Sequence, residues 1–169
     1  WGDIAENSKR FANYLTTLNL KASDCVATIA WNNHRHLETW YGISGSGLVC
    51  HTINPRLFPE QLSFIVNDAD DQVLIFDKTL VNLVLSIKAN IPKVKQFICL
   101  DAYDADIAQI FPDLQFYDDL IEHQSMQFTW PTLDENTASS LCYTAGKTGI
   151  PKGVLYSHRS TVLHSYASS

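Results

Sequence analysis

Glycine, threonine and lysine residues gather in one short stretch of the chain, between residues 144 and 153. Three of the seven glycines fall there, and glycine permits backbone conformations that turn successive N–H groups toward one point. Threonine hydroxyls add hydrogen-bond donors, and lysine adds a mobile positive charge suited to phosphate. The pattern predicts a loop that cradles a polyphosphate. The candidate phosphate-binding residues are Thr144, Ala145, Gly146, Lys147, Thr148, Gly149, Lys152 and Gly153.

Two other interpretations of this stretch are weaker. A plain hairpin turn would explain the glycines but not the two lysines and two threonines among them. A Walker-type P-loop needs a glycine where Leu141 stands and a helix directly after its Lys-Thr pair, whereas Pro151 and Gly153 follow here. An apolar run leads into the stretch and another, over 154–156, leads out of it. We therefore predict a strand on each side of the loop.

The composition fits one globular domain. The chain has 169 residues and a mass of 19.0 kDa, and its 46% hydrophobic and 18% charged residues exclude an intrinsically disordered protein. A net charge of −6 provides no basic surplus for nucleic acid. No apolar run approaches the roughly 18 residues of a membrane helix, so no transmembrane segment is predicted. The four cysteines form no CxxC pair, so we expect reduced cytosolic thiols rather than a zinc site or a disulfide framework.

Alternating helical and strand patterns precede the candidate loop. Apolar residues spaced by three and four predict helices, and short apolar runs predict buried strands. An asparagine at position 32 or 33 is expected to cap the second helix, and Pro59 to open the third. The acidic stretch 101–127 is interpreted as an irregular surface excursion. The alternation predicts an α/β fold with a mostly parallel sheet covered by helices. Four helices are predicted: over 4–18, from the cap at 32 or 33 to 46, starting at 59, and over 79–89. Strands are predicted over 25–30, 48–53, 72–76 and 96–100.

Several other side chains carry chemistry but are assigned structural roles. His34 and His36 lie two residues apart on a predicted helix and point in different directions, so no metal site is expected. Ser157 is expected to cap the helix that it begins. His158 follows the loop closely and stays open between a site residue and a capping or packing residue. Four aromatic residues are assigned to the core or to an interface: Trp31, Trp40, Tyr41 and Phe58.

The two ends of the chain suggest a piece of a longer protein. Met126 is the only methionine, so Trp1 is not expected to be a translation start. No glycine or proline stop follows the helix predicted after Ser157. We expect residues 1–169 to be a partial N-terminal domain that is truncated at both ends.

The ordered string from Tyr143 to Val154, with Ser157 and His158 after it, resembles the signature of the AMP-forming acyl-CoA synthetases. These enzymes belong to the adenylate-forming superfamily, and the usual form of the signature is Tyr-Thr-Ser-Gly-Thr-Thr-Gly-x-Pro-Lys-Gly-Val. Residues 1–5, 30–38 and 51–61 resemble the branch of medium- and long-chain fatty-acid–CoA ligases. The resemblance covers essentially the whole chain.

This resemblance implies an ATP-dependent ligase that activates a fatty or related carboxylic acid as acyl-adenylate and transfers it to coenzyme A. It implies Mg²⁺ with the ATP and a cytoplasmic enzyme, and it leaves a homodimer and a peripheral membrane contact open. The family's ribose-binding aspartate, adenine motif and catalytic lysine lie downstream of the signature. No catalytic residue is therefore expected within this piece, and the isolated piece is expected to be inactive.

Two positions depart from the family signature. Ala145 stands where the family has serine, which removes one hydroxyl donor, and Lys147 stands where it has threonine. We expect ATP binding to be weakened but not abolished. Two alternatives stay open: a non-catalytic nucleotide-binding relative, and an aryl-acid ligase or adenylation domain of a peptide synthetase.

Overall fold

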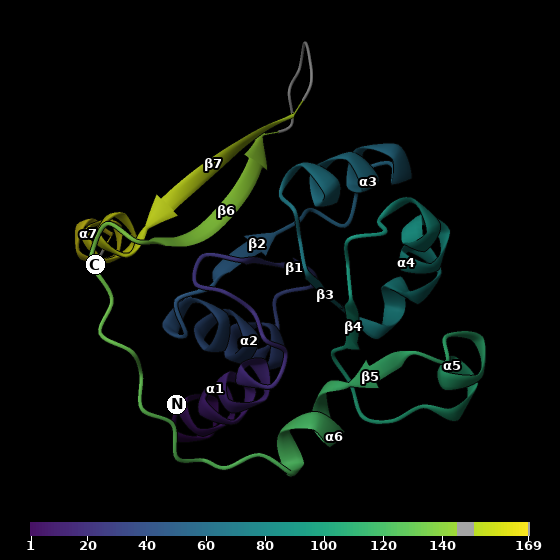
Figure 1. Cartoon of the computed structure of the whole chain (residues 1–169), viewed down its shortest axis with the longest axis horizontal. Helices are drawn as coiled ribbons and strands as arrows, with labels where there is room; N and C mark the ends of the chain where they lie inside the picture. The colour runs from purple at the N-terminus through teal and green to yellow at the C-terminus, as the bar shows by residue number, and fades with distance from the viewer. Residues whose placement is uncertain (145–150, 169) are drawn as a thin grey trace.

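The structure is a computed structural model, and it describes residues 1–144 and 151–168. Within these residues the strands form one sheet in the order β5-β4-β3-β1-β2-β6-β7 (Figure 1). Neighbouring strands are parallel, except that β7 runs antiparallel to β6. The predicted α/β fold with a mostly parallel sheet is confirmed. The strands are β1 (Cys25–Ile29), β2 (Val49–Thr52), β3 (Val73–Phe76), β4 (Gln96–Cys99), β5 (Leu114–Phe116), β6 (Ala138–Thr144) and β7 (Lys152–Ser157).

Helices cover both faces of the sheet (Figure 1). One face packs against α1 (Gly2–Thr16), α2 (His34–Gly45) and α6 (Tyr117–Glu122), and the other against α3 (Pro59–Asp68), α4 (Val81–Ile87) and α5 (Ala105–Ile110). Short 3₁₀ turns, Lys78–Leu80 and Lys88–Asn90, flank α4, and α7 (His158–Ala167) follows β7. Among the helices described, none combines the length and the apolar character that a membrane crossing requires.

The central strand β1 shows why the sheet has two covered faces. Its side chains alternate, so Ala27 and Ile29 pack under α3 and α4 while Val26 packs under α1 and α2. Side chains on both faces of β1 are buried, and its sequence is therefore almost entirely apolar. The same burial on both faces explains the apolar run of β3.

Helix starts follow capping residues that the sequence predicts. The Asn33 side chain accepts a hydrogen bond from the His36 backbone N–H at 2.9 Å and caps α2. The Ser157 hydroxyl accepts one from the Ser160 N–H at 3.1 Å and caps α7. Pro59 is the first residue of α3, where a missing N–H costs nothing. The predicted starts of these three helices are confirmed.

The expectation of an irregular surface excursion over 101–127 is wrong. This stretch contains α5, β5 and α6, and β5 is an edge strand of the sheet paired with β4. Its acidic residues stabilise these elements: Asp104 caps α5 and pairs with Lys78 at 2.7 Å, and Asp118 forms two hydrogen bonds with Arg35 at 2.8 and 2.7 Å. Each element is six residues long or shorter, which is too short for apolar periodicity to predict.

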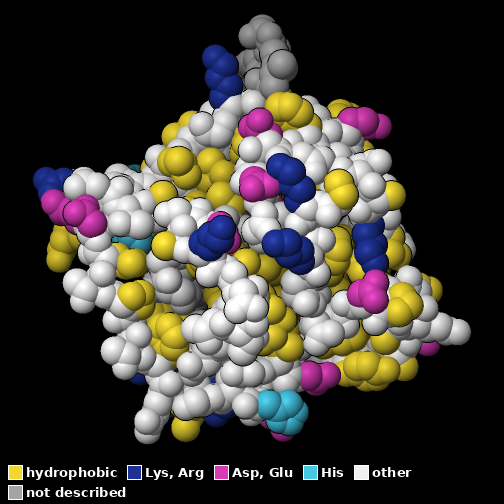
Figure 2. Space-filling view, in the orientation of Figure 1, with side chains coloured by type: hydrophobic (Ala, Val, Ile, Leu, Met, Phe, Trp, Pro, Cys, Tyr) yellow, Lys and Arg dark blue, Asp and Glu magenta, His cyan; other side chains and the backbone are white. Residues whose placement is uncertain are grey.

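The β6–β7 hairpin and α7 leave apolar side chains uncovered. Leu155 of β7 is 61% exposed and Leu163 of α7 is 53% exposed. Figure 2 shows hydrophobic side chains gathered on the surface over this hairpin. These side chains contrast with those of β1, whose apolar residues pack on both faces.

Candidate functional site

The two ends of the predicted phosphate loop face each other across the β6–β7 hairpin. In the register of these strands, Thr144 pairs with Lys152 and Tyr143 pairs with Gly153. The Thr144 hydroxyl lies 3.4 Å from the Lys152 carbonyl oxygen and donates to it. The pairing brings three of the predicted site residues together. The other five lie outside the described residues and stay predictions: Ala145, Gly146, Lys147, Thr148 and Gly149.

The site lies at the carboxyl edge of the parallel sheet. Because β6 runs parallel to β2, the residue that ends it, Thr144, lies at the edge where β1, β2 and β3 also end. The chain leaves β1 toward α2 on one face and leaves β2 toward α3 on the other. Open α/β sheets bind ligands at this edge, where consecutive connections diverge. The topology therefore places Thr144 and Lys152, which border the predicted loop, at the edge where such sheets bind ligands.

Lys152 has its ammonium group available for a ligand. The residue is exposed at the start of β7. None of the ion pairs within residues 1–144 and 151–168 uses it. A flexible lysine at this position can supply positive charge to a phosphate group without first breaking an existing pair.

Gly153 has a packing role that the sequence analysis missed. A Cβ atom at this position would lie 3.2 Å from Leu141 Cδ1 and 3.2 Å from Tyr143 Cζ. A Cβ atom there would require Tyr143 or Leu141 to move by a few tenths of an ångström. The glycine therefore gives the tyrosine its room, in addition to the predicted role in the loop.

Tyr143 leads to a polar cluster that the sequence analysis also missed. Its hydroxyl donates to Asp68 Oδ2 at 2.7 Å, and its ring centroid lies 5.2 Å from that of His51. His51 Nδ1 is hydrogen-bonded to Asp71 Oδ2 at 2.7 Å, and both side chains are fully buried. Burial raises the pKa of Asp71, and the hydrogen bond with His51 opposes that shift. A histidine within the short, largely apolar run of β2 was the available signal in the sequence.

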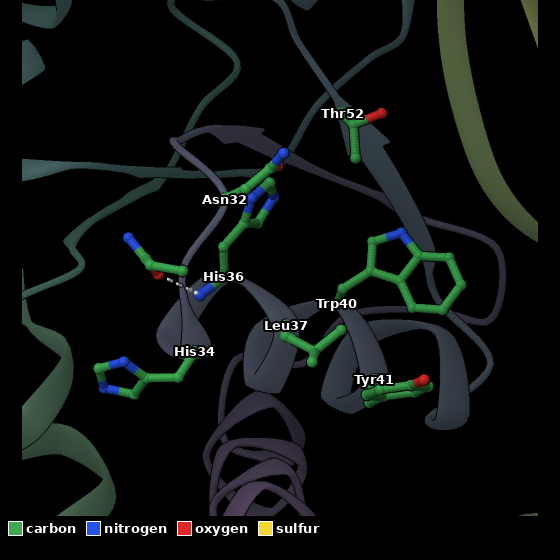
Figure 3. A pocket seen from close by; sticks show the side chains of 8 residues that line it. Asn32, His34, His36, Leu37, Trp40, Tyr41 and Thr52 are labelled. Carbon is green, nitrogen blue, oxygen red and sulfur yellow. Dashed lines mark hydrogen bonds between the residues drawn. The ribbon is translucent and has the colours of Figure 1, made fainter.

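A cavity of about 570 Å³ opens beside Thr52, at the same edge of the sheet (Figure 3). Asn32, His36 and Trp40 border it, and Figure 3 shows His34 pointing away from the space between them. His36 Nε2 lies 3.0 Å from Thr28 Oγ1, and burial lowers the pKa of His36. The cavity has one apolar wall and one polar wall.

Of the four aromatic residues assigned to the core or to an interface, three are exposed and Trp40 is half-buried against the core. Tyr41 is 44% exposed and, with Trp40, lines the cavity. Trp31 donates through its indole N–H to Thr79 at 3.0 Å, and Phe58 is 73% exposed. The core assignment is therefore wrong for Trp31, Tyr41 and Phe58, whereas an interface role for them stays a prediction. Aromatic side chains at the start of a helix or in a loop are not distinguished from core residues by their type alone.

Two further expectations about polar residues concern metals and His158. The residues described contain no group of three His, Cys, Asp or Glu side chains that could hold a metal ion. His158 lies at the far end of β7 from Lys152, and a strand of this length separates them by roughly 20 Å. His158 therefore lies away from Lys152, as the first residue of α7. All four cysteines are free, and burial raises the pKa of Cys25 and Cys99 to about 12.

The sequence profile of the AMP-binding enzymes matches residues 1–169, and the chain belongs to this family. A 3-methylmercaptopropionyl-CoA ligase of Ruegeria lacuscaerulensis is 57% identical over 169 residues, covering 100% of this chain and 31% of that enzyme. A medium-chain-fatty-acid–CoA ligase of Ectopseudomonas oleovorans is 48% identical, again covering 100% of this chain and 31% of that enzyme. An inhibitor-bound crystal structure of the N-terminal domain of FACL13 from Mycobacterium tuberculosis has a TM-score of 0.83 at 25% identity, covering 99% of this chain and 40% of that one. The chain thus spans 31% of the length of these two curated relatives.

Proposed function

We propose that the protein carrying this chain is an AMP-forming acyl-CoA ligase. A carboxylate oxygen attacks the α-phosphorus of ATP, the bond to the β-phosphate breaks, and acyl-adenylate and pyrophosphate form. The thiol of coenzyme A then displaces AMP, loses its proton and becomes the thioester. The observation that carries the proposal is the pairing of Thr144 with Lys152 at the carboxyl edge of the sheet, in a chain that belongs to the AMP-binding enzymes along its whole length.

In this proposal the loop residues bind the β- and γ-phosphates of ATP. Thr144 and the N–H groups of the loop donate to phosphate oxygens, and Lys152 offsets the charge that develops on the leaving pyrophosphate. Mg²⁺ bound with the ATP would add positive charge to the triphosphate. The part of the chain that the structure describes assembles no carboxylate cluster for the ion, so we assign no step to it.

The proposed acid is an aliphatic carboxylate. The two relatives named above are 57% and 48% identical, and their names specify a 3-methylmercaptopropionyl-CoA ligase and a medium-chain-fatty-acid–CoA ligase. Neither name describes an aryl acyl group. They support an aliphatic acid over the aryl acids of the alternative interpretation.

Acid-dependent ATP–pyrophosphate exchange tests the proposal. The complete open reading frame that contains this chain is expressed and assayed with octanoate, 3-methylmercaptopropionate and benzoate, with and without coenzyme A. We expect exchange with the first two acids, and AMP and thioester when coenzyme A is added. Exchange that is the same with and without acid would contradict the proposed activity, and exchange with benzoate alone would favour an aryl-acid ligase.

Restoring the usual signature residues should tighten ATP binding. In the complete protein, Ala145→Ser returns a hydroxyl donor and Lys147→Thr returns a short side chain. One hydrogen bond to a charged oxygen contributes about 1.5–3 kcal/mol, so the double variant should bind ATP roughly tenfold or more tightly. Titration calorimetry with ATP measures this change. Equal dissociation constants for the two proteins would show that the departures do not weaken the site.

A further inference from the structure

Tyr143 occupies a position from which it can control both ends of the phosphate loop. It directly precedes Thr144 on β6 and pairs with Gly153, which directly follows Lys152 on β7. Its ring fills the space that the missing side chain of Gly153 leaves open. The ring is therefore attached to one residue that borders the loop and packs on the neighbour of the other.

A hydrogen bond to α3 holds the Tyr143 ring in this position. The hydroxyl donates to Asp68 Oδ2 at 2.7 Å, and Asp68 is the last residue of α3. A carboxylate at a helix C-terminus is unfavourable for the helix itself, because the helix dipole is negative there. The position of Asp68 is thus not explained by the stability of α3, whereas the contact with Tyr143 explains it.

The groups around the Tyr143 ring explain why its hydrogen bond to Asp68 should affect the position of the ring. On one side the ring packs against His51, whose own orientation is fixed by the 2.7 Å hydrogen bond to Asp71. On the other side Tyr143, Asp68 and Gly153 line a cavity of about 360 Å³. The ring has room to turn into that cavity once its hydroxyl is released. The bond to Asp68 is the restraint that keeps it against His51.

We propose that Tyr143 is a positioning residue for ATP and that Asp68 holds it there, so that Thr144 and Lys152 are preorganised for the triphosphate. The inference rests on the proposed function for the identity of the ligand. Neither side chain touches ATP in this account, since both act through the backbone of the hairpin. The expected consequence is a change in ATP affinity with no change in affinity for the acid or for coenzyme A.

The test compares ATP binding by variants of the complete protein. Tyr143→Phe keeps the ring and removes the hydroxyl, and Asp68→Ala removes the acceptor from the other side. A net hydrogen bond of ordinary strength corresponds to a roughly three- to tenfold weaker ATP dissociation constant in either variant. Asp68→Asn keeps an acceptor oxygen and should retain most of the affinity. The KM values for the acid and for coenzyme A should stay within twofold of the wild type.

Tyr117→Phe is the matched control. It removes a tyrosine–carboxylate bond of the same kind, from Tyr117 to Glu38 at 2.9 Å, but on the opposite face of the sheet under α1 and α2. We expect it to lower the melting temperature and to leave ATP affinity unchanged. An equal loss of ATP affinity in Tyr117→Phe would mean that general destabilisation is the cause, and this result would overturn the inference.

The remaining outcomes separate this inference from the proposed function. ATP titration measures the ATP dissociation constant, which the positioning role is expected to change, and it needs no acid substrate. If the wild type binds ATP and Tyr143→Phe and Asp68→Ala bind it equally well, the positioning role is wrong whatever the exchange assay gives. If the variants lose affinity but no acid supports exchange, the positioning role stands and the proposed ligase activity fails. A wild type that does not bind ATP overturns both.

Discussion

Replacing Lys152 with methionine should lower the rate of acid-dependent ATP–pyrophosphate exchange in the complete protein by roughly 10²–10³-fold, the usual effect of removing one group that stabilises charge in a transition state. Methionine keeps an unbranched chain of similar length and removes only the ammonium group. Lys152 pairs across the hairpin with Thr144 and is exposed, so its charge is available to the pyrophosphate that leaves. The loss should appear mainly in kcat, because this charge develops as the bond breaks.

Lys93→Met is the control for this substitution. Lys93 is also an exposed lysine, and its ammonium forms a 2.7 Å ion pair with Asp70, far in sequence from the loop. Exposed ion pairs contribute only about 0.2–1 kcal/mol, so the control should retain its exchange rate. Similar rates for the wild type and Lys152→Met would remove Lys152 from the phosphate site.

Most elements of the fold could be predicted because the residues that form them are neighbours in the sequence. Asn33 caps α2 with its own side chain, and Pro59 starts α3 because its ring suits the first helical turn. Strands β1 and β3 are buried on both faces, so nearly all of their residues are apolar and stand out from their neighbours. The strands on either side of the phosphate loop were predicted from their apolar runs, although β7 is exposed along most of its length.

The polar contacts around the site could not be predicted, because they join distant parts of the chain. Asp68 and Tyr143 are 75 residues apart, and His51 and Asp71 are 20 residues apart. The second pair forms only when β2 and β3 take their places on either side of β1. Sequence spacing indicates neither contact, since each depends on the order of strands in the sheet.

Burial of a particular aromatic residue is equally hard to predict from its type. Phe11 lies in the helix predicted over 4–18 and Phe58 was assigned to the core or to an interface, yet Phe11 is 0% exposed and Phe58 is 73% exposed. Phe11 lies on α1 where α2 approaches closely, because Gly42 has no side chain to separate the helices. A Cβ atom at Gly42 would lie 3.0 Å from Phe11 Cδ1. Phe58 directly precedes α3, and no helix among the described residues covers it.

Phe11→Ala should therefore lower the free energy of unfolding of the domain by about 3–5 kcal/mol, whereas Phe58→Ala should change it by about 0.5 kcal/mol or less. The Phe11 ring packs 5.5 Å from the Tyr117 ring between α1, α2 and the sheet, so its removal leaves a cavity that these helices cannot close. Urea unfolding of the complete protein, followed through the transition of the domain that holds this chain, measures both changes. The two variants remove the same atoms, so their difference isolates the effect of burial. Equal shifts of the two midpoints would contradict the packing of α1 against α2 and the sheet.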